Sequence, residues 1–120
     1  MKIHTGCDVE QIARFEELLK KEHFCQRVFT DAEQTHIAKS GHPEATAAGI
    51  FCAKEAMAKA LGRGLFGLLP RELGVEWDER GAPHPVLTGS AADQYGQMQL
   101  AVSISHSGDT AFATCVALEE

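Results

Sequence analysis

The sequence predicts one domain that mixes helices and strands, and three observations support this class. Its 120 residues are enough for a single hydrophobic core but not for two. An alanine-rich segment with helical spacing occupies the middle of the chain. Segments that alternate apolar and polar residues lie at the start and through much of the second half. We therefore expect one domain spanning residues 1–120.

The first element expected is a short strand over residues 2–7, which ends near Gly6. Asp8 then lies where the strand meets a helix predicted over residues 9–21. An aspartate there is either the N-cap of that helix or a metal ligand presented at a strand end, and the local pattern favours the cap. The helix should bury Val9 and every third or fourth residue after it.

Thr30-Asp31-Ala32-Glu33 has the form of a capping box, in which the threonine and glutamate side chains bond each other's backbone N–H groups. It predicts a helix over residues 31–40 that stops at Gly41. Glu33 thereby has a sufficient structural role, and its spacing gives no reason to regard it as catalytic.

The central helix is predicted over residues 44–61, with Pro43 in its first turn. Glu55 and Lys59 are four residues apart and therefore share one face. The glycine-rich segment after them, Gly62-Arg63-Gly64, allows positive φ and close approach to the backbone. A surface ion pair followed by a glycine C-cap is one interpretation. A site for a phosphorylated ligand is the other, and the many alanines favour it, because charges near a packed helix need partners or a ligand.

The second half of the chain reads as two hairpins with a short helix between them. The expected elements are strands over 73–78 and 84–87 joined by a turn, a helix over 90–96 capped by Ser90, and strands over 99–105 and 110–118 joined by a turn at 105–109.

Composition limits the classes of function. The net charge of −6 argues against non-specific nucleic-acid binding, and any acidic partner needs a local basic patch. No apolar run approaches the roughly 20 residues of a membrane helix, and no signal peptide is evident, so we expect a cytoplasmic protein without membrane contact. The four cysteines and six histidines lack zinc-site spacing.

Ser105, His106 and Asp109 are the residue types of a hydrolase triad, but their spacing argues against one. Triad members converge from separate elements, whereas neighbours in a strand point to opposite faces. His106 is then either a solvated turn residue or a contact for a phosphate group.

Five segments resemble the holo-acyl-carrier-protein synthase type of 4′-phosphopantetheinyl transferase. Residues 6–15 are similar to its opening G-x-D-[IV]-x-x-I-x-R-[IF], and residues 24–33 to F-x-x-R-[VI]-[LF]-T-x-x-E. Residues 51–64 resemble its most specific signature, F-[AC]-A-K-E-A-x-x-K-A-[LF]-G-x-G. Residues 102–106 resemble V-S-[IL]-[ST]-H, and residues 78–83 its D-x-x-G-x-P hairpin. The resemblance extends over essentially the whole chain.

The resemblance implies an α+β fold in which an antiparallel sheet packs against the long central helix. It also implies a transferase that moves 4′-phosphopantetheine from coenzyme A to a serine of an apo acyl carrier protein, releasing adenosine 3′,5′-bisphosphate. Such enzymes serve fatty acid or polyketide carriers, and those of this size are homotrimers with active sites between subunits.

The same resemblance assigns roles to residues. Asp8 and Glu55 are expected to hold Mg²⁺, Glu55 to be the base, and Lys59 to stabilise the leaving group. Coenzyme A is expected at Lys59, Gly62, Arg63, Gly64 and His106. The acyl carrier protein is expected at Arg14, and Lys21 and Arg27 complete a basic patch.

One position departs from the family pattern. Ile50 stands where an arginine commonly contacts the 3′-phosphate of coenzyme A, so that contact must come from other groups such as Arg63, His42 or His106. The alternatives are a catalytically weak homologue that binds a carrier or nucleotide without transfer, and a small metal-dependent phosphoesterase.

Overall fold

The computed structural model describes residues 1–64 and 67–120. Its elements in chain order are β1 (Lys2–Gln11), α1 (Arg14–Leu18), α2 (Glu22–Val28), α3 (Asp31–Lys39), α4 (Pro43–Ala60), the 3₁₀ helix η2 (Pro70–Glu72), β2 (Leu73–Trp77), β3 (Pro83–Leu87), α5 (Gly89–Tyr95), β4 (Gln99–Ser107) and β5 (Thr110–Glu119). The predicted α+β class is confirmed. No helix in the described part of the chain is both long and apolar enough to span a membrane.

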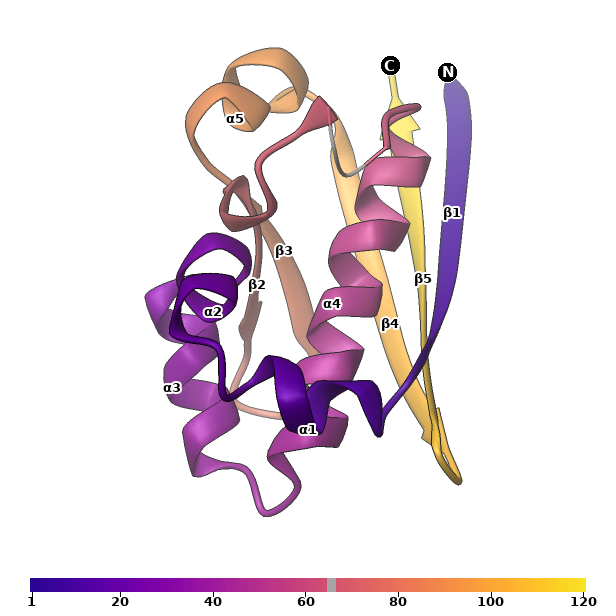
Figure 1. Ribbon diagram of the computed structural model, residues 1–120. Helices are drawn as coiled ribbons and strands as arrows, with labels where there is room; N and C mark the ends of the chain where they lie inside the picture. Colours follow the sequence, from indigo (N-terminus) through magenta and orange to yellow (C-terminus); the bar gives the residue numbers. More distant parts are fainter. Residues whose placement is uncertain (65–66) are drawn as a thin grey trace.

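The strands form two antiparallel sheets. The larger has the order β1-β5-β4, and the smaller is the hairpin of β2 and β3. Because β1 pairs with β5 along its whole length, from Lys2 opposite Glu119 to Gln11 opposite Thr110, the first and last strands lie side by side. Figure 1 shows α4 crossing one face of the larger sheet, with α1, α2 and α3 beside its N-terminal half.

Small residues allow α4 to approach this sheet closely. Its buried positions include Ala53, Ala56 and Ala60, and the inner face of β5 is formed by Ala111, Ala113, Cys115 and Ala117. At Gly6 of β1, any Cβ would overlap the carbonyl oxygen of Ala56. Close packing between helix and sheet therefore depends on glycine at this position, since even alanine would push the helix away.

The N-terminal region differs from the prediction. β1 continues to Gln11, so Asp8 lies inside a strand and caps no helix, and Val9 is 55% exposed instead of buried. The predicted helix over residues 9–21 is reduced to the five residues of α1, and α2 forms in a segment for which no helix was predicted. Pairing with β5 explains the difference, because residues 8–11 gain a ladder of inter-strand hydrogen bonds that the local pattern does not reveal.

The remaining predictions agree closely with the structure. Thr30 and Glu33 form the expected capping box at the start of α3, and Pro43 begins α4. Two details are wrong. Thr88 and not Ser90 precedes α5, because the Ser90 hydroxyl donates a hydrogen bond to Glu72 instead. His106 lies within β4 and not in the turn that follows it.

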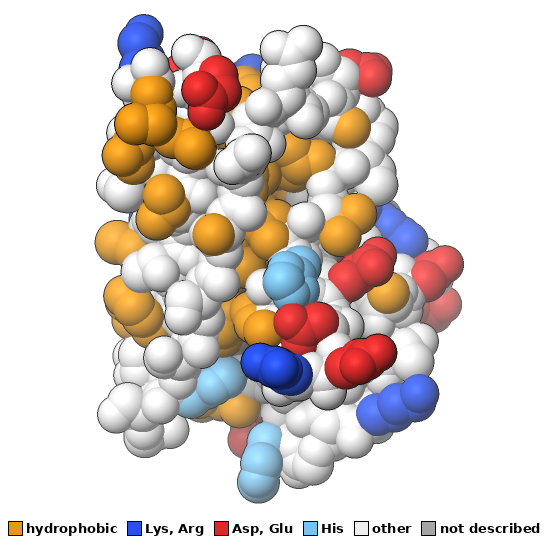
Figure 2. All heavy atoms as spheres, turned by 180° about the vertical axis from the view of Figure 1, so that it is seen from behind, with side chains coloured by type: hydrophobic (Ala, Val, Ile, Leu, Met, Phe, Trp, Pro, Cys, Tyr) orange, Lys and Arg blue, Asp and Glu red, His pale blue; other side chains and the backbone are white. Residues whose placement is uncertain are grey.

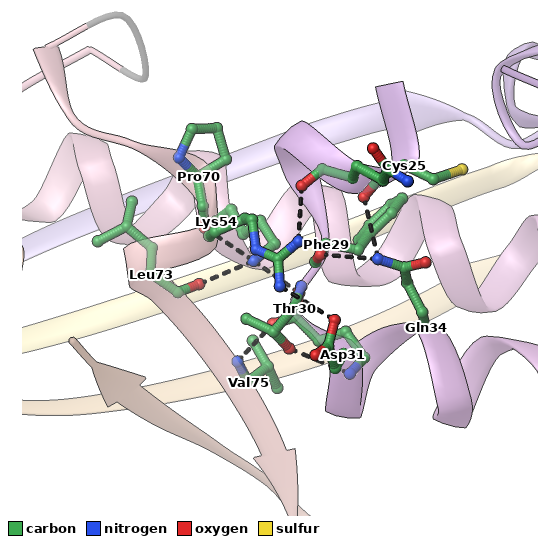
Figure 3. A network of polar contacts seen from close by, with 12 residues as sticks. Cys25, Phe29, Thr30, Asp31, Gln34, Lys54, Pro70, Leu73 and Val75 are labelled. Atoms are coloured by element: carbon green, nitrogen blue, oxygen red, sulfur yellow. Dashed lines mark hydrogen bonds and ion pairs between the residues drawn. The ribbon is translucent and has the colours of Figure 1, made fainter. Parts of the chain in front are cut away.

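A buried ion pair joins α4 to α3. Lys54 Nζ lies 2.7 Å from Glu33 Oε1, and both side chains are fully buried. Lys54 also donates to the carbonyl oxygens of Pro70 and Leu73, as Figure 3 shows. The other oxygen of Glu33 accepts the backbone N–H of Val75 in β2 at 2.7 Å. Burial lowers the pKa of Lys54, and the Glu33 carboxylate opposes that shift. Each charge is thus satisfied by several partners, as a buried ion pair requires.

Removal of one partner of this pair is expected to destabilise the fold. Lys54→Ala leaves a buried carboxylate without its counter-ion and should lower the free energy of unfolding by about 3–5 kcal/mol in urea titrations. Lys39→Ala, at an exposed lysine in the last turn of α3, is the matched control and should change it by less than about 0.5 kcal/mol. Similar effects of the two variants would contradict this role of Lys54.

Candidate active site

The structure brings Asp8 of β1 against Lys59 of α4, from positions 51 residues apart. Residues of β1 alternate between the open face of the sheet and the face under α4, and Asp8 is on the helix side. Lys59 Nζ lies 3.4 Å from Asp8 Oδ1 and donates to the Cys7 carbonyl oxygen at 2.9 Å. The lysine is thereby fixed at the mouth of a site formed by the first strand and the central helix.

Glu55 lies one turn before Lys59 on α4 and is half-buried. Burial raises the pKa of Glu55, and the Asp8 carboxylate raises it further, while Lys59 and then Arg14 oppose the shift. The carboxylate of Glu55 therefore lies within the electrostatic influence of Asp8 and Lys59. A carboxylate with a raised pKa is better suited to accept a proton than an ordinary surface glutamate.

Glu10 is a third carboxylate at this site, and the sequence analysis missed it. It lies two residues after Asp8 on the same face of β1, and its side chain is only 14% exposed. Burial raises the pKa of Glu10 to about 7, followed in importance by the adjacent Asp8 carboxyl, and Arg14 opposes the shift. Alternation along a strand would have indicated Glu10, but only if residues 8–11 had been recognised as a strand.

The carboxylates fit a divalent cation that is shared with a ligand. Asp8 Oδ2 is buried and has no hydrogen-bond partner within the described chain. Among the residues that the structure describes, no group of three or more histidine, cysteine, aspartate or glutamate side chains is arranged to hold a metal. Two carboxylates still suit Mg²⁺, which is commonly bound by one or two carboxylates with water and substrate phosphates as its other ligands.

The glycine turn after α4 has the predicted backbone freedom. Gly62 has a φ of +77°, and a Cβ at Gly64 would meet nothing within 4 Å. The Arg63 guanidinium donates to the Gly67 carbonyl at 3.0 Å. It also donates to the hydroxyl of Tyr95, the last residue of α5, at 3.2 Å. Beside Gly62 opens a cavity of about 470 Å³, which is bounded by α4, α5 and the ends of β1 and β5.

His106 lies away from the carboxylates. Its Nε2 is 2.8 Å from the carbonyl oxygen of Ala45, in the first turn of α4. Ten residues of helix separate Ala45 from Glu55, which corresponds to about 15 Å. Within one chain, therefore, the structure does not bring His106 to Asp8, Glu55 and Lys59.

A separate hollow of about 190 Å³ contains His106 and Ile50. Its described lining has no lysine or arginine, and its ionisable groups are the imidazoles of His36 and His106. His36 stacks on Trp77, with ring centroids 3.6 Å apart and planes 6° from parallel. Ile50 itself is 1% exposed, so its side chain belongs to the core below the hollow.

The three basic residues expected to bind a partner lie on α1, on α2 and at the residue just before α2. Arg14, Lys21 and Arg27 are all exposed. Arg14 is paired with Glu10 and lies over the rings of Phe15 and Phe51.

Comparison with known proteins gives a consistent result. The profile of the 4′-phosphopantetheinyl transferase superfamily matches residues 4–115. Holo-[acyl-carrier-protein] synthase of Caldanaerobacter subterraneus is 34% identical over 122 aligned positions, covering 98% of this chain and 96% of that protein. The enzyme of the same name from Syntrophotalea carbinolica is 38% identical, covering 92% and 91%.

Solved structures are similar over nearly the whole chain. Holo-[acyl-carrier-protein] synthase of Neisseria meningitidis superposes with a TM-score of 0.85 at 30% identity, covering 97% of this chain and 98% of that one. The Helicobacter pylori enzyme, solved in complex with coenzyme A, gives 0.84 at 29% identity and covers 95% and 99%.

The stacking of His36 on Trp77 leads to a pH-dependence that can be measured. Burial lowers the pKa of His36, so the folded chain favours the neutral ring. The neutral ring therefore stabilises the folded chain at pH values above the ordinary histidine pKa of about 6.5. This stabilisation is lost as the pH falls through the lower pKa that His36 has in the folded state. Since Trp77 is the only tryptophan, its fluorescence should report a titration with a midpoint below 6.5.

His36→Phe should preserve the stack and abolish this titration, whereas His23→Gln, at an exposed histidine of α2, should leave it unchanged. A midpoint at or above about 6.5 in the unmodified chain would contradict the prediction.

Proposed function

The chain belongs to the 4′-phosphopantetheinyl transferase superfamily, and we infer from this that it is a holo-acyl-carrier-protein synthase. It transfers 4′-phosphopantetheine from coenzyme A to a serine of an apo acyl carrier protein. The serine oxygen forms a new bond to the phosphorus that carries pantetheine. The phosphoanhydride bond of coenzyme A breaks, adenosine 3′,5′-bisphosphate leaves, and the serine proton passes to a base.

The observation that best supports this chemistry in the chain itself is the meeting of Asp8, Glu55 and Lys59 where β1 packs against α4. We propose that Asp8 and Glu55 hold Mg²⁺, with the partnerless Asp8 Oδ2 as one ligand atom. When bound, the cation would neutralise negative charge on the phosphoanhydride.

Glu55 is the proposed base for the serine hydroxyl. Its half-buried carboxylate lies at the site with Asp8 and Lys59, where it would accept the serine proton directly or through a metal-bound water. Lys59 is placed to offset charge on the departing bisphosphate, because its ammonium is already held at this site by Asp8 and the Cys7 carbonyl.

Coenzyme A is proposed to pass from Lys59 along the open turn of Gly62, Arg63 and Gly64. His106 is proposed to contact the nucleotide end of the donor. Because His106 lies about 15 Å along α4 from Glu55, it would do so in a neighbouring subunit.

We propose a homotrimer in which each site lies between two subunits, each subunit being one domain of residues 1–120. The face of the larger sheet opposite α4 carries several large apolar side chains that are exposed in the single chain. Its exposed apolar residues are Ile3, Val9, Phe112 and Val116. Figure 2 shows a column of hydrophobic side chains on this side of the molecule, as expected for a surface that packs against another subunit.

The acyl carrier protein is proposed to dock on α1 and α2 through Arg14, Lys21 and Arg27. Residues 14–28 carry four lysine and arginine residues against three glutamates, a balance more favourable to an acidic partner than that of the chain as a whole. We further propose that the enzyme acts in the cytoplasm and serves lipid biosynthesis.

The reaction is tested by the intact mass of an apo acyl carrier protein after incubation with this chain, coenzyme A and Mg²⁺. The mass should increase by one phosphopantetheine unit, and EDTA should abolish the increase. Glu55→Gln should reduce the rate by about 100-fold or more because it removes the base and one metal ligand. Glu44→Gln, at the other end of the same helix, is the control and should react like the unmodified chain.

No mass increase with several folded apo carriers would contradict the transferase assignment. A rate for Glu55→Gln close to that of the control would instead contradict only the role of Glu55.

The trimer is tested by a charge placed on the exposed sheet face. Val116 is 45% exposed in the single chain, so Val116→Glu should leave the subunit folded. It should shift the mass measured by light scattering from trimer to monomer and abolish transfer, because a buried unpaired charge disfavours the interface. Glu76→Lys, on the exposed side of β2, should remain trimeric and active. A fully active monomer would contradict the proposal.

A further inference from the structure

Glu10 makes a contact that the chemistry described above does not use. Glu10 is the last residue but one of β1, and Arg14 is the first residue of α1. A carboxylate oxygen of Glu10 lies 2.5 Å from Nη1 of Arg14. The two side chains differ in exposure, since Glu10 is 14% exposed and Arg14 is 53% exposed. A largely buried carboxyl group thus holds a cation whose outer part remains in solvent.

Two aromatic rings restrict the same guanidinium. Its central carbon lies 5.8 Å from the ring centroid of Phe15 and 5.7 Å from that of Phe51. These rings are 5.6 Å apart and belong to the core. Arg14 is therefore supported from below by rigid aromatic side chains and from one side by Glu10, which leaves it little rotational freedom.

Arg14 is nevertheless available to a partner. A guanidinium has five N–H donors, and within the described residues Arg14 makes one side-chain hydrogen bond, to Glu10. Phe51 lies one helical turn before Glu55 on α4, and the positive charge of Arg14 opposes the rise in the pKa of Glu55. The open donors are thus presented at the rim of the carboxylate site, where a protein substrate must bring its serine.

We propose that Glu10 is a positioning residue, which holds Arg14 against Phe15 and Phe51 so that its free N–H groups bind a carboxylate of the acyl carrier protein. This rests on the proposed function. A flexible arginine loses rotamer entropy when it docks, and an arginine already fixed by Glu10 and two rings loses less. The ion pair therefore strengthens binding although it uses one donor of Arg14.

Glu10 also lies beside Asp8, so the experiment must separate an effect through Arg14 from an effect through the metal ligand. A double-mutant cycle does this, because residues that act through one contact give effects that do not add. The variants are Glu10→Ala, Arg14→Ala and the combination. The measured quantities are KM and kcat for carrier modification, and the Kd for a carrier whose acceptor serine is replaced by alanine.

We expect Glu10→Ala to weaken carrier binding about 5-fold and Arg14→Ala about 10-fold or more, within the range of coupled contact pairs. The double variant should match Arg14→Ala alone. The loss should fall on KM for the carrier more than on kcat, and half-saturation by Mg²⁺ should not shift. Glu10→Gln, which keeps an acceptor oxygen, should recover part of the loss.

Glu76→Ala, which removes an exposed carboxylate from β2 and not from the proposed docking surface, is the matched control and should leave KM unchanged. Effects of Glu10→Ala and Arg14→Ala that multiply in the double variant, tighter carrier binding by Glu10→Ala, or a shifted Mg²⁺ requirement would each overturn the proposal. If the unmodified chain transfers nothing to any carrier, the proposed function fails; if it transfers and the cycle is additive, only the role of Glu10 fails.

Discussion

The rotation of α4 about its own axis is the constraint on which the rest of the structure depends, and the buried pair of Lys54 and Glu33 fixes it. Lys54 points away from the large sheet, where Glu33 of α3 and the carbonyls of Pro70 and Leu73 surround its ammonium. The next residue, Glu55, is offset by about 100° around the helix. A helix held at Lys54 therefore directs Glu55 away from Glu33, and in this orientation the Asp8 carboxylate of β1 raises the pKa of Glu55.

Close packing completes this arrangement from the other side of the helix. Glycine at position 6 lets the backbone of β1 meet Ala56, and the alanines of β5 form a flat surface under α4. Lys59 is close enough to contact Asp8 and the Cys7 carbonyl because no bulkier side chain separates helix and strand. The packing of small apolar residues thus sets the positions of the charged groups at the site. A larger core residue would move α4 away from β1 and so separate Lys59 from Asp8, even without direct contact with either.

The sequence was sufficient for elements whose signals are local. The capping box at Thr30, the proline that begins α4 and the alternating residues of β2 each have a short-range cause, and the structure has all three. The sequence was insufficient where pairing with a segment far away in the chain determines the secondary structure. Residues 8–11 have helix-compatible spacing, but pairing with β5 makes them a strand, and with that error Glu10 went unrecognised. The family resemblance pointed to Asp8 as a site residue, but it could not show that Asp8 lies inside a strand beside Lys59.

The pairing of β1 with β5 has a consequence for the order in which the protein can fold. Lys2 lies opposite Glu119, so the strand that carries Asp8 has no hydrogen-bonding neighbour until residues near the other end of the sequence are available. Contacts at such long sequence separation close a large loop and form slowly. The contact between Lys54 and Glu33 can join α3 and α4 while β1 is still unpaired. The proposed site is thus expected to be one of the last parts of the molecule to assemble, because the strand that carries Asp8 depends on a partner strand at the other end of the sequence.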